Sequence, residues 1–203
     1  MKKNKKLDVI FVLDKSGSMS NACESTITSF NEYLEREKNN NYETYITTVL
    51  FSDTYHFLHK RKIISDVKNL TREDYVPSGC TALYDSIGAS INFIDSYDTD
   101  KVMFVIITDG YENHSKEFDK KSIKRLIDKH SKYEFLYIGA DIDSYACGSD
   151  IGISRKNIAN FKKNKEWSSI MIDCVSNFAG AMMEDSDCDW KESLDKYISS
   201  NKE

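Results

Sequence analysis

Two short apolar runs constrain the fold more strongly than any other feature of this sequence. Residues 7–13 (LDVIFVL) and 101–107 (KVMFVII) are nearly uninterrupted stretches of Val, Ile, Leu, Phe and Met. Runs of this length and composition are typical of strands buried on both faces, and such strands occur mainly in parallel sheets covered by helices. We therefore expect both runs to be central strands of an α/β domain.

The rest of the chain alternates between strand-like and helix-like patterns. Apolar residues recur at helical spacing in four segments, 21–38, 82–97, 119–130 and 165–183, with Asn21 and Glu24 as a capping box at the start of the first. Further strands are expected at 44–51, 55–59, 133–138 and 157–161.

The segments 44–51 and 55–59 are close enough in sequence to form a hairpin, which places one antiparallel strand at a sheet edge. The pattern predicts a doubly wound, mostly parallel six-stranded sheet with helices on both faces. In the commonest order of such sheets the first strand lies beside the fourth.

The length of 203 residues suits one domain, since domains usually contain ~50–250 residues. We expect a basic tail at 1–6, a domain at 7–184 and a C-terminal extension at 185–203 whose apolar spacing permits a short helix.

Composition narrows the class of protein. The net charge of −5 argues against a nucleic-acid-binding surface, and no stretch of the sequence has the length and apolarity of a membrane span or secretory signal. The five scattered cysteines are odd in number and have no CxxC spacing, which indicates reduced thiols rather than disulfides or a zinc site. We expect a cytoplasmic protein that is a monomer when free.

Polar side chains gather where the two central strands end. Asp14 follows the first strand and Asp109 follows the fourth, so both carboxylates should meet above the sheet. Ser16 and Ser18 alternate around a glycine, and Thr81 stands just before a helix. Two unpaired carboxylates there would repel each other, and a bound cation removes that repulsion. An all-oxygen site with few anionic ligands favours Mg²⁺ over Ca²⁺, with Mn²⁺ able to substitute.

Three motifs resemble those of the von Willebrand factor A family: DKSGS at 14–18, SGCTALYD at 78–85 and ITDGYEN at 107–113. The resemblance covers roughly 7–183 and is closest in style to stand-alone intracellular bacterial or phage members. It implies a metal-ion-dependent adhesion site. Ser16, Ser18 and Thr81 would be direct or near-direct ligands, while Asp14 and Asp109 would act directly or through water. An acidic side chain of a partner protein would complete the metal's coordination.

The chain is therefore interpreted as a protein-binding module, not an enzyme. One alternative is a metal-dependent hydrolase such as a phosphoesterase, but the sequence has no carboxylate two residues after Asp14 and no P-loop or Gly-x-Ser-x-Gly elbow. Another is a metal-independent structural subunit of a phage or secretion assembly.

Three further residues lie near these motifs. We expect Cys80 to be a small buried residue rather than a reactive thiol, His114 to be a surface histidine, and Asp141 to cap a helix.

Overall fold

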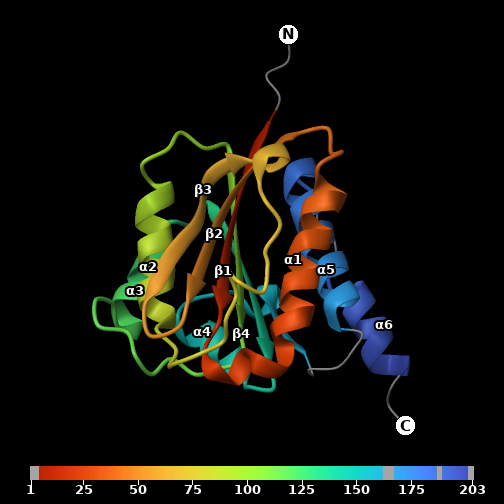
Figure 1. Ribbon diagram of the computed structural model, residues 1–203. Coiled ribbons are helices and arrows are strands. Elements are labelled where there is room, and N and C mark those ends of the chain that lie inside the picture. The colour runs from red at the N-terminus through yellow and green to blue at the C-terminus, as the bar shows by residue number, and fades with distance from the viewer. Residues whose placement is uncertain (1–4, 162–166, 187–188, 201–203) are drawn as a thin grey trace.

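The computed structural model is built around one six-stranded sheet, shown in Figure 1. It describes residues 5–161, 167–186 and 189–200, without the side chains of 167, 168 and 197–200. The strands lie in the order β3-β2-β1-β4-β5-β6. They are β1 (Lys6–Asp14), β2 (Glu43–Phe51), β3 (Tyr55–Ile63), β4 (Lys101–Thr108), β5 (Tyr133–Ala140) and β6 (Ile158–Phe161).

All neighbouring strands are parallel except β2 and β3, which form the expected antiparallel hairpin at one edge. The predicted fold class is therefore confirmed, including the adjacency of the first and fourth strands.

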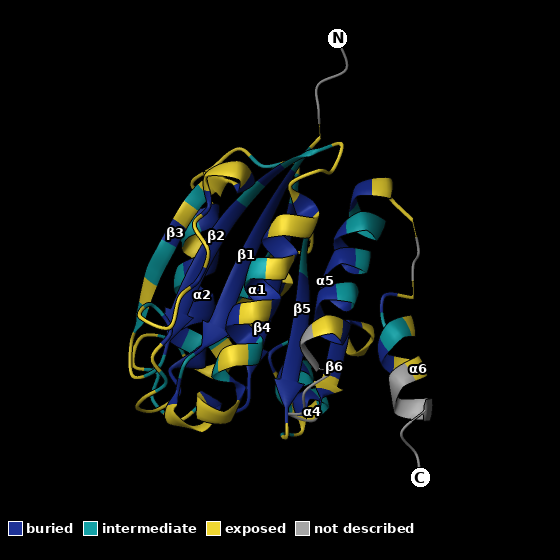
Figure 2. Cartoon of the chain, turned by 45° about the vertical axis from the view of Figure 1, so that its right-hand side comes forward, coloured by how far each residue is buried: buried dark blue, intermediate teal, exposed yellow. Residues whose placement is uncertain are grey.

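Helices cover both faces of the sheet. One layer holds α1 and α5, which pack against each other, and the other holds α2, α3 and α4. Figure 2 shows the central strands as a buried layer, the edge strand β3 as partly exposed, and the helices with exposed outer faces. The helices are α1 (Cys23–Glu37), α2 (Leu83–Ile94), α3 (Lys120–Lys129), α4 (Ser144–Asp150), α5 (Trp167–Glu184) and α6 (Glu192–Ser200), the last packed on α5.

The two core layers follow from strand geometry, in which successive side chains point to opposite faces. In β1, Val9, Phe11 and Leu13 join the α1–α5 layer, whereas Ile10 and Val12 join the other. Strand β4 alternates in the same way. Both runs are almost entirely apolar because each of their faces is covered.

Two local expectations were wrong. The Asn21–Glu24 capping box does not form, because Asn21 lies inside a 3-10 turn, Gly17–Ala22, and α1 starts at Cys23 without a side-chain cap. Asp141 has a positive φ of 57° and caps no helix; the cap of α4 is Asp143, which accepts a hydrogen bond from the Ala146 amide.

Helix α4 itself was not predicted. It has only seven residues and contains Gly148, so its sequence shows no helical periodicity. A Cβ at Gly148 would lie 2.8 Å from the Ile158 side chain, so the glycine allows α4 to pack closely on β6.

Some expectations lie outside the described residues: most of the basic run at 2–6, the start of the 165–183 helix, and Cys188. The domain bounds 7–184 stay a prediction. Among the described residues, the helices are all too short or too polar to cross a membrane.

Candidate metal centre

Backbone hydrogen bonds hold the loop at the carboxyl end of β1 against the segment before α2. The Gly17 amide donates to the Gly79 carbonyl at 3.1 Å, and the Ser78 amide donates to the Lys15 carbonyl at 2.9 Å. The segment carrying Thr81 is thereby placed beside the loop carrying Ser16 and Ser18.

Asp14 is the most buried member of the predicted set, with no exposed surface. One carboxylate oxygen accepts a hydrogen bond from the Ser16 amide at 2.7 Å, and the other accepts one from the Thr108 hydroxyl at 2.5 Å. The hydroxyls of Ser16 and Ser18 lie 3.1 Å apart, and the Ser18 hydroxyl donates to Asp109 at 2.5 Å. These contacts connect four of the five predicted residues.

Thr81 is the fifth. Its position follows from Gly110, the residue after Asp109: a Cβ built at Gly110 would lie 2.8 Å from the Thr81 hydroxyl oxygen and 3.6 Å from an Asp14 carboxylate oxygen. Thr81 therefore lies at the same end of the sheet as Asp14. Gly110 keeps open the space between them, which any larger residue would fill.

The electrostatics of Asp14 are unfavourable without a cation. The pKa of its carboxyl is raised to about 6, mainly by burial and to a smaller extent by the nearby charge of Asp109. Hydrogen bonds from Thr108 and Ser16 act in the opposite direction but do not offset the burial. In the described part of the chain, no Lys, Arg or His side chain forms an ion pair with Asp14.

These observations fit a divalent cation. Two buried carboxylates and three hydroxyls converge, and all their donor atoms are oxygen, as Mg²⁺ prefers. Asp14, Asp109, Ser16 and Thr81 are buried whereas Ser18 is exposed, so the group of oxygens opens to solvent on one side.

The sequence interpretation missed several residues that position this site. The Thr108 hydroxyl bonds Asp14 and accepts from the Gly110 amide at 3.1 Å, and the Tyr75 hydroxyl donates to the Asp14 carbonyl. A threonine ending a buried strand beside Asp109 was a readable signal for Thr108. Tyr75 lies far from Asp14 in sequence, and no pattern linked the two.

Two acidic residues organise the loop after β4. Glu112 accepts hydrogen bonds from the amides of Tyr84, His114 and Ser115, between 2.7 and 2.9 Å. Asp85, in the first turn of α2, accepts from three successive amides, those of Lys116, Glu117 and Phe118, between 2.8 and 2.9 Å. The loop is thus tied to the start of α2, next to Thr81.

Cys80 differs from its prediction, since it is exposed rather than buried. The reason is the turn before Thr81: Gly79 has a positive φ of 75°, and residues 78–80 all lie on the surface.

No protein-family model and no curated protein sequence matches the chain. Solved structures do. Proximal thread matrix protein 1 from the mussel byssus aligns with a TM-score of 0.67 and 20% identity over 84% of this chain and 45% of that protein, so this chain spans about half of its length. Another structure of that protein has a zinc-occupied MIDAS motif, the metal-ion-dependent adhesion site.

Two bacterial structures give similar alignments. The vWF domain of the type V pili tip protein Mfa5 from Porphyromonas gingivalis aligns with a TM-score of 0.63 and 11% identity, over 88% of this chain and 96% of that one. A von Willebrand factor type A protein from Catenulispora acidiphila aligns with a TM-score of 0.60 and 10% identity, over 84% and 42%. Together with the strand order and the loops described above, these likenesses show that the chain has the von Willebrand factor A fold.

Proposed function

We propose that this chain is a protein-binding module whose binding depends on a divalent cation, Mg²⁺ or Mn²⁺, held by Asp14, Ser16, Ser18, Thr81 and Asp109. The observation that carries the proposal is the buried Asp14 carboxylate, which lacks a cationic side-chain partner among the described residues yet lies among three hydroxyls and a second carboxylate. When bound, the cation would accept an Asp or Glu carboxylate of the partner as a ligand.

The residues of the chain have separate tasks in this proposal. Asp14 and Asp109 supply two negative charges, which nearly neutralise a divalent cation and leave room for one further carboxylate. Thr108 and the Ser16 amide hold the Asp14 carboxylate in place through two hydrogen bonds of 2.5 and 2.7 Å. Ser18 is exposed, so it lies on the side from which a partner approaches.

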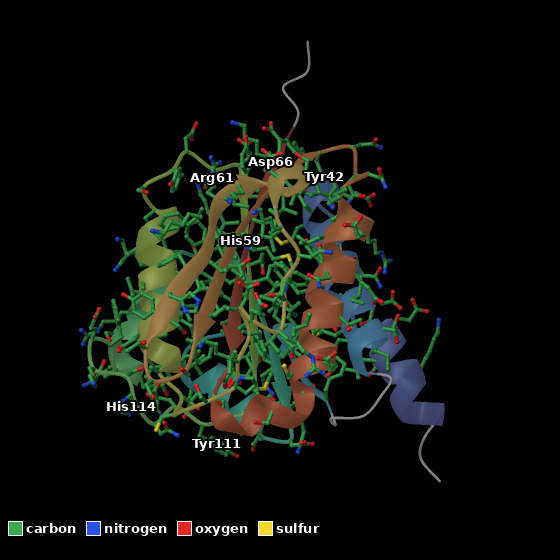
Figure 3. The ribbon with its side chains drawn as sticks, in the orientation of Figure 1. Tyr42, His59, Arg61, Asp66, Tyr111 and His114 are labelled. Carbon is green, nitrogen blue, oxygen red and sulfur yellow. The ribbon has the colours of Figure 1, made fainter. Side chains whose placement is uncertain are left out.

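The surface beside the site suits a protein partner. Tyr111 follows Gly110 and is 57% exposed, and tyrosine is enriched in protein interfaces. Figure 3 shows Tyr111 at the end of the molecule where β1 and β4 end. The likeness to a pili tip protein and a byssus matrix protein supports a binding role rather than an enzymatic one.

Copurification from the source cells tests this proposal. Tagged wild-type chain with Mg²⁺ should retain a partner that is released by EDTA. Asp14→Ala should retain none, whereas Asp98→Ala, which changes an exposed aspartate before β4 at the other end of the sheet, should behave as wild type. A partner that stays bound in excess EDTA, and equally to Asp14→Ala, would refute the metal-dependent mechanism. A cytoplasmic location and a monomeric free state remain part of this proposal.

A further inference from the structure

A second group of ligand-type side chains lies beside the site described above. The carboxylate of Asp53, the thiol of Cys80 and the imidazole of His114 have one ligand atom each within 4.8 Å of the others. They come from three separate segments: the β2–β3 turn, the segment before α2 and the loop after β4. None belongs to the proposed Mg²⁺ site formed by Asp14, Ser16, Ser18, Thr81 and Asp109, which is called the oxygen-lined site below. Figure 3 shows His114 at the same end of the molecule as Tyr111.

Backbone contacts hold the three segments together at these residues. The Ala82 amide donates to the carbonyl of Ser52, the neighbour of Asp53, at 2.8 Å. The amide of Asn113, the neighbour of His114, donates to the Thr81 carbonyl at 3.1 Å. The Asn113 side chain in turn accepts from the Thr81 amide at 2.9 Å. The backbone that carries each of the three side chains is therefore fixed relative to the others.

Gly79 allows the Asp53 carboxylate to lie close to the backbone of the segment before α2. The Cys80 amide donates to an Asp53 carboxylate oxygen at 2.7 Å, so Asp53 lies directly against this turn. A Cβ at Gly79 would come within 2.4 Å of the other Asp53 oxygen, and the φ of 75° already favours glycine. Any larger residue at position 79 would push the Asp53 carboxylate away from Cys80.

We propose that Asp53, Cys80 and His114 bind a Zn²⁺-class cation, with the fourth position open to water or an added ligand. Carboxylate oxygen, thiolate sulfur and imidazole nitrogen are the three ligand types that Zn²⁺ takes from proteins. Sulfur and nitrogen ligands separate this site from the all-oxygen one, which suits Mg²⁺.

The geometry needs only a small adjustment. Ligand atoms of a tetrahedral zinc site lie roughly 3.5 Å apart, given metal–ligand bonds of about 2.0–2.3 Å. The separations of up to 4.8 Å must therefore shorten by about 1 Å. Asp53 and Cys80 are exposed and His114 is half-buried, so their side chains can rotate without disturbing the core.

Titration of the full chain with Co²⁺, a spectroscopic substitute for Zn²⁺, tests the proposal because a cobalt–thiolate bond gives a charge-transfer band. Excess Mg²⁺ keeps the oxygen-lined site occupied. The wild type should develop the band, and Zn²⁺ should displace it. Cys80→Ser should lose it, and His114→Ala and Asp53→Asn should each weaken binding by at least about 10-fold.

Matched controls exclude other ligands. Cys23→Ser and His56→Ala change a cysteine and a histidine outside the group and should leave the titration unchanged. Asp14→Ala should retain the band, so failure of the oxygen-lined site and failure of this one are distinguishable. A titration without the band, a band that survives Cys80→Ser, or binding indifferent to Asp53→Asn or His114→Ala would overturn the proposal.

Discussion

Strand β1 carries a buried aspartate near each end, and the two have different surroundings. Asp8 and Asp14 lie on the same face of the strand, and they are only 1% and 0% exposed. Burial raises the pKa of both carboxyls. Asp8 has a fixed counter-ion, since the Arg61 guanidinium donates to its two oxygens at 2.8 and 3.2 Å. Asp14 has hydroxyl and amide donors instead.

The difference separates a charge that is compensated within the fold from one that the proposed cation would compensate. Arg61 comes from β3 and forms an ion pair with Asp8, so the charge at that end of β1 is compensated within the fold and requires no bound cation. Figure 3 shows Arg61 at the end of the molecule opposite Tyr111 and His114. At the Asp14 end the charge is oriented but not neutralised by a side chain, an arrangement that suits an exchangeable cation.

The largest expected effect is on metal binding. Asp14→Ala removes the central carboxylate and should abolish Mg²⁺ and Mn²⁺ binding in calorimetry, because even loss of a residue that only supports a ligand costs about 10–100-fold in affinity. Asp8→Ala should leave the affinity within about 2-fold of wild type, since Asp8 lies at the other end of the strand. Equal losses of metal affinity in both variants would show that the two ends of β1 do not differ in metal binding.

Removing the counter-ion Arg61 tests the role of the Asp8 end of β1. Arg61→Ala leaves the Asp8 carboxylate buried without a partner, which should lower the free energy of unfolding by about 3 kcal/mol. Chemical denaturation measures this loss. Adding Asp8→Asn to Arg61→Ala should recover part of it, because the uncompensated charge is then gone. A double variant no more stable than Arg61→Ala would show that Arg61 acts through packing alone.

The third prediction concerns pH in the metal-free protein. The folded pKa of Asp14, about 6, lies above the ordinary value of 3.8. The folded state therefore binds this proton more tightly than the unfolded state, so protonation of Asp14 stabilises the fold. This stabilisation is complete below pH 3.8 and is lost as the pH rises through 6. The loss amounts to about 2–3 kcal/mol.

Unfolding in EDTA between pH 4 and pH 7 measures this slope. Asp8 contributes in the same direction, so the informative quantity is the difference between wild type and Asp14→Asn. The variant should have a flatter profile and should be the more stable protein near pH 7. Parallel profiles would mean that the Asp14 charge is not destabilising.

The smallest effect is expected at Thr81. Thr81→Val keeps the shape of the side chain and removes only the hydroxyl, which should weaken Mg²⁺ binding by about 10-fold. The melting temperature of the metal-free protein should change little, and calorimetry together with thermal unfolding separates the two effects. An unchanged Mg²⁺ affinity in Thr81→Val would show that the Thr81 hydroxyl is not a metal ligand.

Most of the fold was readable from local patterns. The apolar runs at 7–13 and 101–107 indicated central strands because a strand covered on both faces has no polar side to show in its sequence. The positions of Asp14 and Asp109 at the carboxyl ends of these strands then placed both residues at the same end of the sheet. Helix α4 was missed because its seven residues include Gly148 and show no helical periodicity.

The sequence by itself determined the class of fold and predicted the five oxygen-bearing residues that are proposed as metal ligands, because periodicity and motif spacing are local properties. Only the tertiary structure decided which side chains support them and which charges are compensated. The Asp8–Arg61 pair, the Tyr75–Asp14 contact and the grouping of Asp53, Cys80 and His114 each join segments that are distant along the chain. Such contacts depend on strand order and loop packing, and no local pattern records them.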